Sequence, residues 1–86
     1  MEKYEFTECS DEEYLKYQEA AANGDEKVLA QVQKFFHGKN SGVTTAFAMG
    51  IKEDLKIIYP IIMSNLSDDK KLEILNLIFP PDKMYI

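Results

Sequence analysis

The chain has 86 residues, of which 45% are hydrophobic, and its net charge at pH 7 is −5. A chain of this length forms a single domain with one small core, and its apolar content excludes an intrinsically disordered protein. All ten basic residues are lysines. Lysine lacks the planar fork with which arginine binds phosphates and bases, so we expect no nucleic-acid partner.

The negative charge lies at one end of the chain. Residues 1–26 contain nine acids and two lysines and so carry −7, whereas residues 27–86 contain six acids and eight lysines and carry +2. Such an asymmetry indicates the kind of partner that a protein attracts rather than its fold.

Membrane-spanning and disulfide-linked proteins are excluded by the same composition. The longest apolar run, Ile57 to Met63, is interrupted by Pro60 and is far shorter than the roughly 20 residues that span a bilayer. Cys9 is the only cysteine, so no internal disulfide forms. The first residues lack the basic and apolar regions of a secretory signal. We therefore expect a cytoplasmic protein with no membrane contact.

The chain begins with a segment that has no helical pattern. Residues 1–9 alternate weakly between apolar and polar side chains, which is typical of a short strand or of an extended arm on the core. The only other segment able to pair with such a strand is the tail from Lys83 to Ile86. We accordingly divide the single domain into an arm (1–9), a helical core (10–79) and a tail (80–86).

A first helix is predicted to start after Ser10, which forms a capping box with Glu13. Acids in its first turn match the positive end of the helix dipole. The helix is expected to run to about Ala22 and to end at Asn23-Gly24, where glycine adopts the left-handed cap conformation. The residues expected to face the core are Tyr14, Leu15, Gln18, Ala21 and Ala22.

A second helix is predicted between Asp25, as its cap, and Gly38, as its stop. A polar, glycine-rich loop is expected at residues 38–42. The apolar face of this helix has the period of a single helical stripe. Its members are Val28, Leu29, Val32, Phe35 and Phe36.

A third helix is expected to start at a cap formed by Thr44 or Thr45, with an apolar stripe that reaches Ile62 and, if Pro60 breaks the helix, a separate turn from Pro60 through Asn65. Gly50 would allow a neighbouring helix to approach closely. Pro60 is expected either to kink this helix or to break it, because proline lacks a backbone donor and clashes with the preceding turn. The apolar stripe consists of Phe47, Ile51, Leu55, Ile58 and Ile62.

Ser67 is predicted to cap a last helix, which Pro80-Pro81 ends. The chain thus has four to five short helices joined by short connections. Connections of this length favour antiparallel neighbours, so the predicted fold is all-α, a compact helical bundle.

The residues that carry chemistry do not form a pattern. Cys9 and His37 lie on separate elements with no third group to orient them, and they are too few for a structural zinc site. The acids at 11–13 and 68–69 lack the alternate spacing of a calcium loop. Residues 38–42 have the wrong order for a phosphate-binding loop. We therefore expect no catalytic residue, no metal ligand and no cofactor, and hence no enzyme.

The acidic end favours a small protein-binding module that inhibits or neutralises a protein partner with a basic surface. Immunity proteins, antitoxins and phage inhibitors fall in the same class of size and charge, although no motif assigns this chain to any of them. The two tyrosines of the first helix would be aromatic anchors. The candidate contacts are Glu8, Asp11, Glu12, Glu13, Tyr14, Tyr17 and Glu19.

An alternative function follows from the apolar surface of residues 57–79. A helix that is apolar on most sides is either central in its fold or covered by a partner. The alternative is a homodimeric helical regulator or assembly subunit that uses the last helix as its interface. The residues predicted for this interface are Leu72, Leu75, Ile78 and Phe79.

Overall fold

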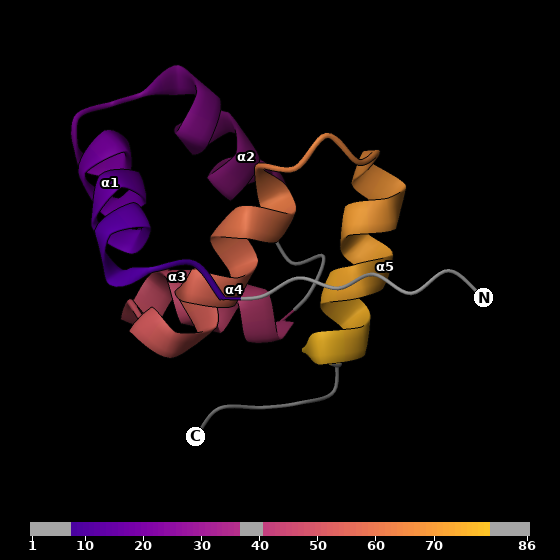
Figure 1. Ribbon diagram of the computed structural model, residues 1–86. Helices are drawn as coiled ribbons and strands as arrows, with labels where there is room; N and C mark the ends of the chain where they lie inside the picture. The colour runs from indigo at the N-terminus through magenta and orange to yellow at the C-terminus, as the bar shows by residue number, and fades with distance from the viewer. Residues whose placement is uncertain (1–7, 37–40, 80–86) are drawn as a thin grey trace.

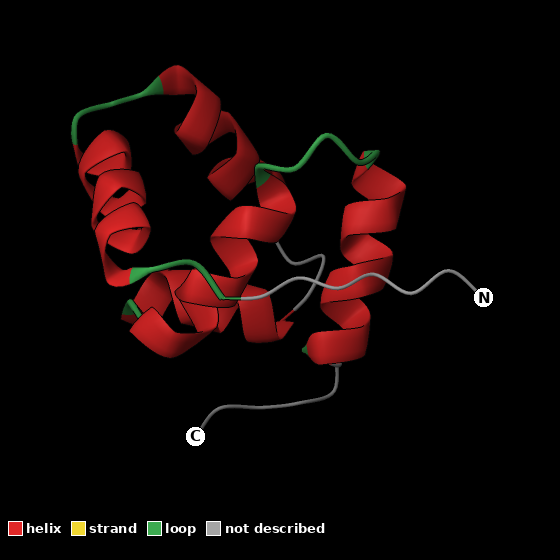
Figure 2. Ribbon diagram, viewed as in Figure 1, coloured by secondary structure: helices red, strands yellow, loops and turns green. Residues whose placement is uncertain are grey.

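The computed structural model describes residues 8–36 and 41–79, and α-helix is the only regular secondary structure in these ranges (Figure 2). The expected all-α bundle is therefore confirmed. The strand or arm expected at the start, its pairing with the tail and the stop at Gly38 all lie outside the described residues. The helices are α1 (Asp11–Ala22), α2 (Glu26–Phe36), α3 (Ser41–Met49), α4 (Lys52–Ile62) and α5 (Asp68–Ile78).

Side-chain caps begin three of the helices as predicted. The Ser10 hydroxyl accepts a hydrogen bond from the N–H of Glu13 at 3.2 Å, and the Ser67 hydroxyl accepts one at 3.3 Å at the start of α5. Asp25 Oδ1 accepts bonds from two N–H groups of α2, at 2.9 and 3.3 Å. Each cap satisfies backbone donors that have no partner inside the helix.

Glycine ends both α1 and α3. Gly24 has a φ of +82° and Gly50 a φ of +64°, the left-handed conformation that side chains disfavour. The N–H of the residue after each glycine bonds to the carbonyl five residues earlier, at 2.8 Å in α1 and at 3.0 Å in α3. This arrangement is the Schellman motif, which satisfies carbonyls at the end of a helix. The predicted stop at Gly24 is confirmed.

The long third helix predicted up to Ile62 is wrong in its start and in its continuity. α3 begins at Ser41, and both threonines lie inside it, where the Thr44 hydroxyl donates to the Phe36 carbonyl at 2.7 Å. The close approach expected at Gly50 is also wrong, because no heavy atom of any residue other than Gly50 and its two chain neighbours lies within 4 Å of the point where a Cβ would stand. Gly50 instead turns the chain between α3 and α4.

Pro60 does not break α4, which continues to Ile62. Because proline has no N–H, the carbonyl of Lys56, four residues earlier, lacks its donor within the helix. The N–H of Cys9 donates to this carbonyl at 2.8 Å. Pro60 therefore leaves the Lys56 carbonyl without a donor inside α4, and Cys9, just before α1, is attached to α4 through this carbonyl.

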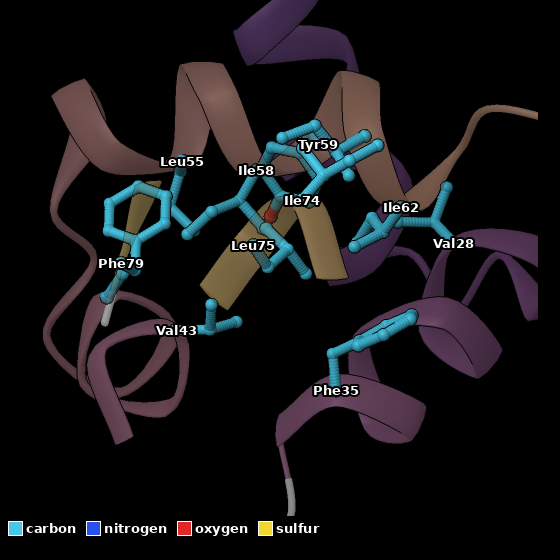
Figure 3. Packing of buried hydrophobic residues seen from close by; sticks show 12 residues of the cluster. Val28, Phe35, Val43, Leu55, Ile58, Tyr59, Ile62, Ile74, Leu75 and Phe79 are labelled. Atoms are coloured by element: carbon cyan, nitrogen blue, oxygen red, sulfur yellow. The ribbon is translucent and has the colours of Figure 1, made fainter. Parts of the chain in front are cut away.

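α4 lies in the middle of the molecule, with α1 to one side and α5 to the other (Figure 1). Buried apolar side chains from α2, α3, α4 and α5 meet around it, and Phe79 adds to them from just beyond α5 (Figure 3). α1 contributes no buried residue. The residues that α4 supplies to the core are Leu55, Ile58, Tyr59, Ile61 and Ile62.

A buried cation joins three of the core helices. Lys71 in α5 is only 4% exposed, and its Nζ donates to the carbonyl of Ile62, the last residue of α4, at 2.7 Å. Nζ also lies 3.5 Å from Oε1 of Gln31 in α2. The positive charge at the end of α4 matches the negative end of the helix dipole and satisfies a carbonyl that has no partner within the helix.

Replacing Gly50 by alanine is expected to lower the free energy of unfolding by about 1–2 kcal/mol, because a Cβ is unfavourable in the left-handed conformation. Gly50→Asn should cost less, since asparagine tolerates this conformation better. Urea unfolding followed by circular dichroism measures both values. An alanine variant as stable as the wild type would show that Gly50 does not require its positive φ.

Candidate protein-binding surface

The acids predicted to contact a partner are exposed on and next to α1. Glu12, Glu13 and Glu19 lie on the helix, and Glu8 lies two residues before its cap. None of these four carboxylates has an ion pair or a hydrogen bond with the described residues. In the described part of the chain these four carboxylates therefore make no direct pair with a lysine.

Asp11 differs from the other acids because it is paired. Its Oδ1 lies 2.9 Å from Nζ of Lys56 and 3.3 Å from Nζ of Lys52, both on α4. The hydrogen bond from Lys56 is the largest cause that holds the pKa of Asp11 below its ordinary value, and the same bond raises the pKa of Lys56. This carboxylate fastens the start of α1 to α4, so part of the acidic charge acts within the fold.

Tyr14 and Tyr17 face α4 rather than solvent, and both are half-buried. The Tyr17 ring stacks on Tyr59, with centroids 5.0 Å apart and planes inclined by 20°, and the Tyr14 ring is tilted at 6.4 Å from the same residue. Gln18 Nε2 donates to the Tyr59 hydroxyl at 3.3 Å. These rings hold α1 in place, and their predicted role as anchors for a partner remains a prediction.

Leu15 is the large apolar side chain on the opposite side of α1. It is 55% exposed, and Ala22 is exposed as well, so the expectation that both face the core is wrong. The stacking of Tyr17 on α4 sets the inward direction of the helix and turns position 15 outward. Glu12, three residues before Leu15, and Glu19, four residues after it, lie on the same side. We call Glu12, Leu15, Lys16 and Glu19 the outer face of α1.

The α5 residues predicted for an oligomer interface are divided between core and surface. Leu75 and Phe79 are buried in the core and Leu72 is half-buried, whereas Ile78 is 39% exposed. Leu77, which is not among the residues predicted for this interface, is 75% exposed. The apolar residues available to a partner at the end of α5 are therefore Leu77 and Ile78.

The cysteine is buried in the described structure, at 7% exposure. Burial, together with the nearby carboxylate of Glu13, raises the pKa of the Cys9 thiol, and a raised pKa lowers the fraction of reactive thiolate. His37 lies outside the described residues. Among residues 8–36 and 41–79, no three histidine, cysteine or acidic side chains are grouped so that they could hold a metal ion.

No helix in the described part of the chain has both the length and the apolar character needed to cross a bilayer. Comparison of the chain with protein-family models, with curated proteins and with solved structures found no match. Exposed surfaces are then the remaining guide to function, and on the outer face of α1 two exposed glutamates lie beside the exposed side chain of Leu15.

Replacing Asp11 by asparagine is expected to lower stability at neutral pH and to have no effect in acid. The folded-state pKa of Asp11 lies below its ordinary value of 3.8. The ionised carboxylate therefore stabilises the fold at higher pH, and this contribution is lost as the pH falls through the folded-state pKa. Urea unfolding of the variant and the wild type at neutral pH and well below pH 3.8 measures the difference.

Glu12→Gln is the matched control for this experiment. It removes a neighbouring carboxylate that has no ion pair with the described residues. Stability at neutral pH should therefore stay close to that of the wild type, since substitutions of unpaired surface groups typically change it by less than about 0.5 kcal/mol. A loss in Asp11→Asn that is equal at both pH values would contradict an electrostatic origin.

Proposed function

We propose that this protein is a small binding module that uses α1 to bind, and thereby to inhibit or neutralise, a protein partner with a basic surface. The observation that supports the proposal best is the outer face of α1, where an exposed leucine lies between two exposed glutamates on a helix with no buried residue. An apolar centre within a polar, solvent-accessible rim is the general arrangement of protein interfaces.

The charge distribution supports a basic partner in particular. The segment that contains α1 carries −7, whereas the rest of the chain carries +2. Charge of one sign on one part of a molecule speeds association with an oppositely charged surface and disfavours other partners. The acids assigned to this role are Glu8, Glu12, Glu13 and Glu19, and none of these four has an ion pair with the described residues.

The residues of α1 that hold the helix against α4 differ from those on its outer face, and this also supports the proposal. Tyr14, Tyr17 and Asp11 hold the helix against α4, and we assign them to positioning the surface rather than to contacting the partner. Leu15 takes the place of the tyrosines as the apolar anchor. In this respect the protein would act as immunity proteins, antitoxins and phage inhibitors do, a likeness of class that rests on size and charge alone.

Charge reversal on the outer face tests the proposal. The partner is first recovered on the immobilised chain from cells of the native host and identified. The double variant Glu12→Lys and Glu19→Lys should then lower the association rate constant by about tenfold or more at low salt and reduce its dependence on ionic strength. Leu15→Ala should mainly raise the dissociation rate, since it removes an apolar contact.

The control for charge reversal is Glu53→Lys with Asp69→Lys, which changes the net charge equally at exposed acids of α4 and α5. Its effect on the association rate should be much smaller, because these acids lie outside α1. Circular dichroism confirms that each variant is folded. Equal effects of the two double variants, or an unchanged affinity for the outer-face variant, would contradict the proposed surface.

A homodimeric regulator or assembly subunit is the second candidate function, and the exposure of Leu77 and Ile78 favours it. Two exposed apolar side chains on one helix end give a small contact between copies. Leu77→Lys should reduce the mass measured by light scattering at high protein concentration, whereas Leu15→Lys should leave it unchanged. A wild-type chain that is monomeric at every concentration would rule this candidate out.

A further inference from the structure

We infer that α1 is a strap that undocks from α2–α5 as a unit while the rest of the core stays folded. The inference does not depend on the partner proposed above, because it concerns contacts within the chain. Proteins open locally in cooperative units whose free energies range from near zero to that of global unfolding. Three features of the described structure mark α1 as such a unit.

The first feature is that α1 contributes no residue to the buried core cluster. Every buried apolar residue of the central cluster comes from α2–α5 or from Phe79, and α1 itself has no buried residue. Before α2, the described chain has only one buried residue, Cys9. Undocking α1 therefore leaves the α2–α5 contacts in place, and it exposes the partly buried side chains of its inner face together with Cys9 and the part of Tyr59 that they cover.

The second feature is the kind of contact that holds α1. Its polar contacts with the core are the bond from the Cys9 N–H to the Lys56 carbonyl, the Asp11 ion pairs and the bond from Gln18 to Tyr59. Ion pairs at exposed sites contribute little to stability and weaken with salt. The apolar contacts of the strap come from the partly buried side chains of Tyr14, Tyr17, Ala20 and Ala21, and among them the Tyr17 ring stacks on Tyr59.

The third feature is a hinge between α1 and α2. Gly24 is exposed and has a φ of +82°, and no heavy atom of any residue other than Gly24 and its two chain neighbours lies within 4 Å of the point where a Cβ would stand. The first turn of α2 is capped by its own residue, Asp25, through Oδ1. Because the first turn of α2 is capped by the side chain of Asp25, a rotation at Asn23 and Gly24 breaks the backbone bonds that end α1 but does not unwind α2.

Opening of the strap uncovers two groups that report on it. Cys9 is buried at 7% exposure and is the only thiol in the chain. Tyr59, which also packs edge-on against Phe47, is buried in the docked state, and burial raises its pKa to about 12. A thiol reagent therefore reads the opening directly, and backbone hydrogen exchange shows which residues take part.

The experiment measures the rate of Cys9 labelling by an aromatic disulfide reagent and the exchange of backbone amides in the intact chain. Both are followed from zero urea to the unfolding transition, under conditions of rapid opening and closing. We expect labelling of Cys9 and exchange of the α1 amides at least tenfold faster than global unfolding allows, with a weak dependence on urea. The α4 amides should follow global unfolding.

Two variants distinguish local opening from a loss of overall stability. Ile74→Val weakens a buried contact of α5 that persists when α1 is undocked, so it should speed exchange in α4 and α5 severalfold and leave α1 and Cys9 unchanged. Asp11→Asn weakens the docked state itself and should speed the labelling of Cys9 and the exchange of α1 together. Glu12→Gln, its neighbour, should change neither.

Two results would overturn the inference. One is that Ile74→Val accelerates Cys9 labelling and α1 exchange by the same factor as exchange in α4, which would mean that α1 opens only when the whole protein unfolds. The other is fast Cys9 labelling while the α1 amides exchange with those of α4, since only the residues before α1 would then be opening.

Discussion

The carbonyl of Lys56 is the point on which the placement of α1 depends. Pro60 leaves this carbonyl without its donor in α4, and the N–H of Cys9 bonds to it at 2.8 Å. The ammonium group of the same lysine reaches Asp11 at 2.9 Å. One residue thus holds the N-terminal segment through both its backbone and its side chain. With the start of α1 fixed beside α4, the stacking on Tyr59 determines which side of the helix faces solvent.

Core packing and the acidic surface lie on different helices. The buried side chains of α2–α5 supply the apolar stabilisation, whereas α1 carries charge on a helix with no buried residue. Apart from Asp11, the acids of α1 have no ion pair with the described residues, so they can change with little effect on folding. Lys71 differs from these exposed acids because its charge is buried. Its ammonium group contacts the Ile62 carbonyl of α4 and the Gln31 side chain of α2, so it joins α5 to both helices.

Short-range signals explain which parts of the fold could be predicted from the sequence. Ser10, Asp25 and Ser67 bond to amides within their own first turns, so their neighbours in sequence suffice to identify them. The break at Gly50 was missed because the apolar period of α3 continues into α4, although a glycine followed by an apolar residue is also a typical helix end. The burial of Leu75 depends on contacts between helices, which no local pattern contains.

On the candidate surface, too, the sequence alone does not show which residues make contacts between helices. Asp11 and Glu12 are adjacent acids in one helical turn, yet two lysines of α4 pair with the first and none with the second. Only the tertiary arrangement separates a carboxylate that docks the helix from one that is available to a partner. Salt screens both interactions. Raising the ionic strength therefore loosens α1 from α4 and at the same time weakens its attraction to a basic surface, so low salt favours the docked helix and fast association together.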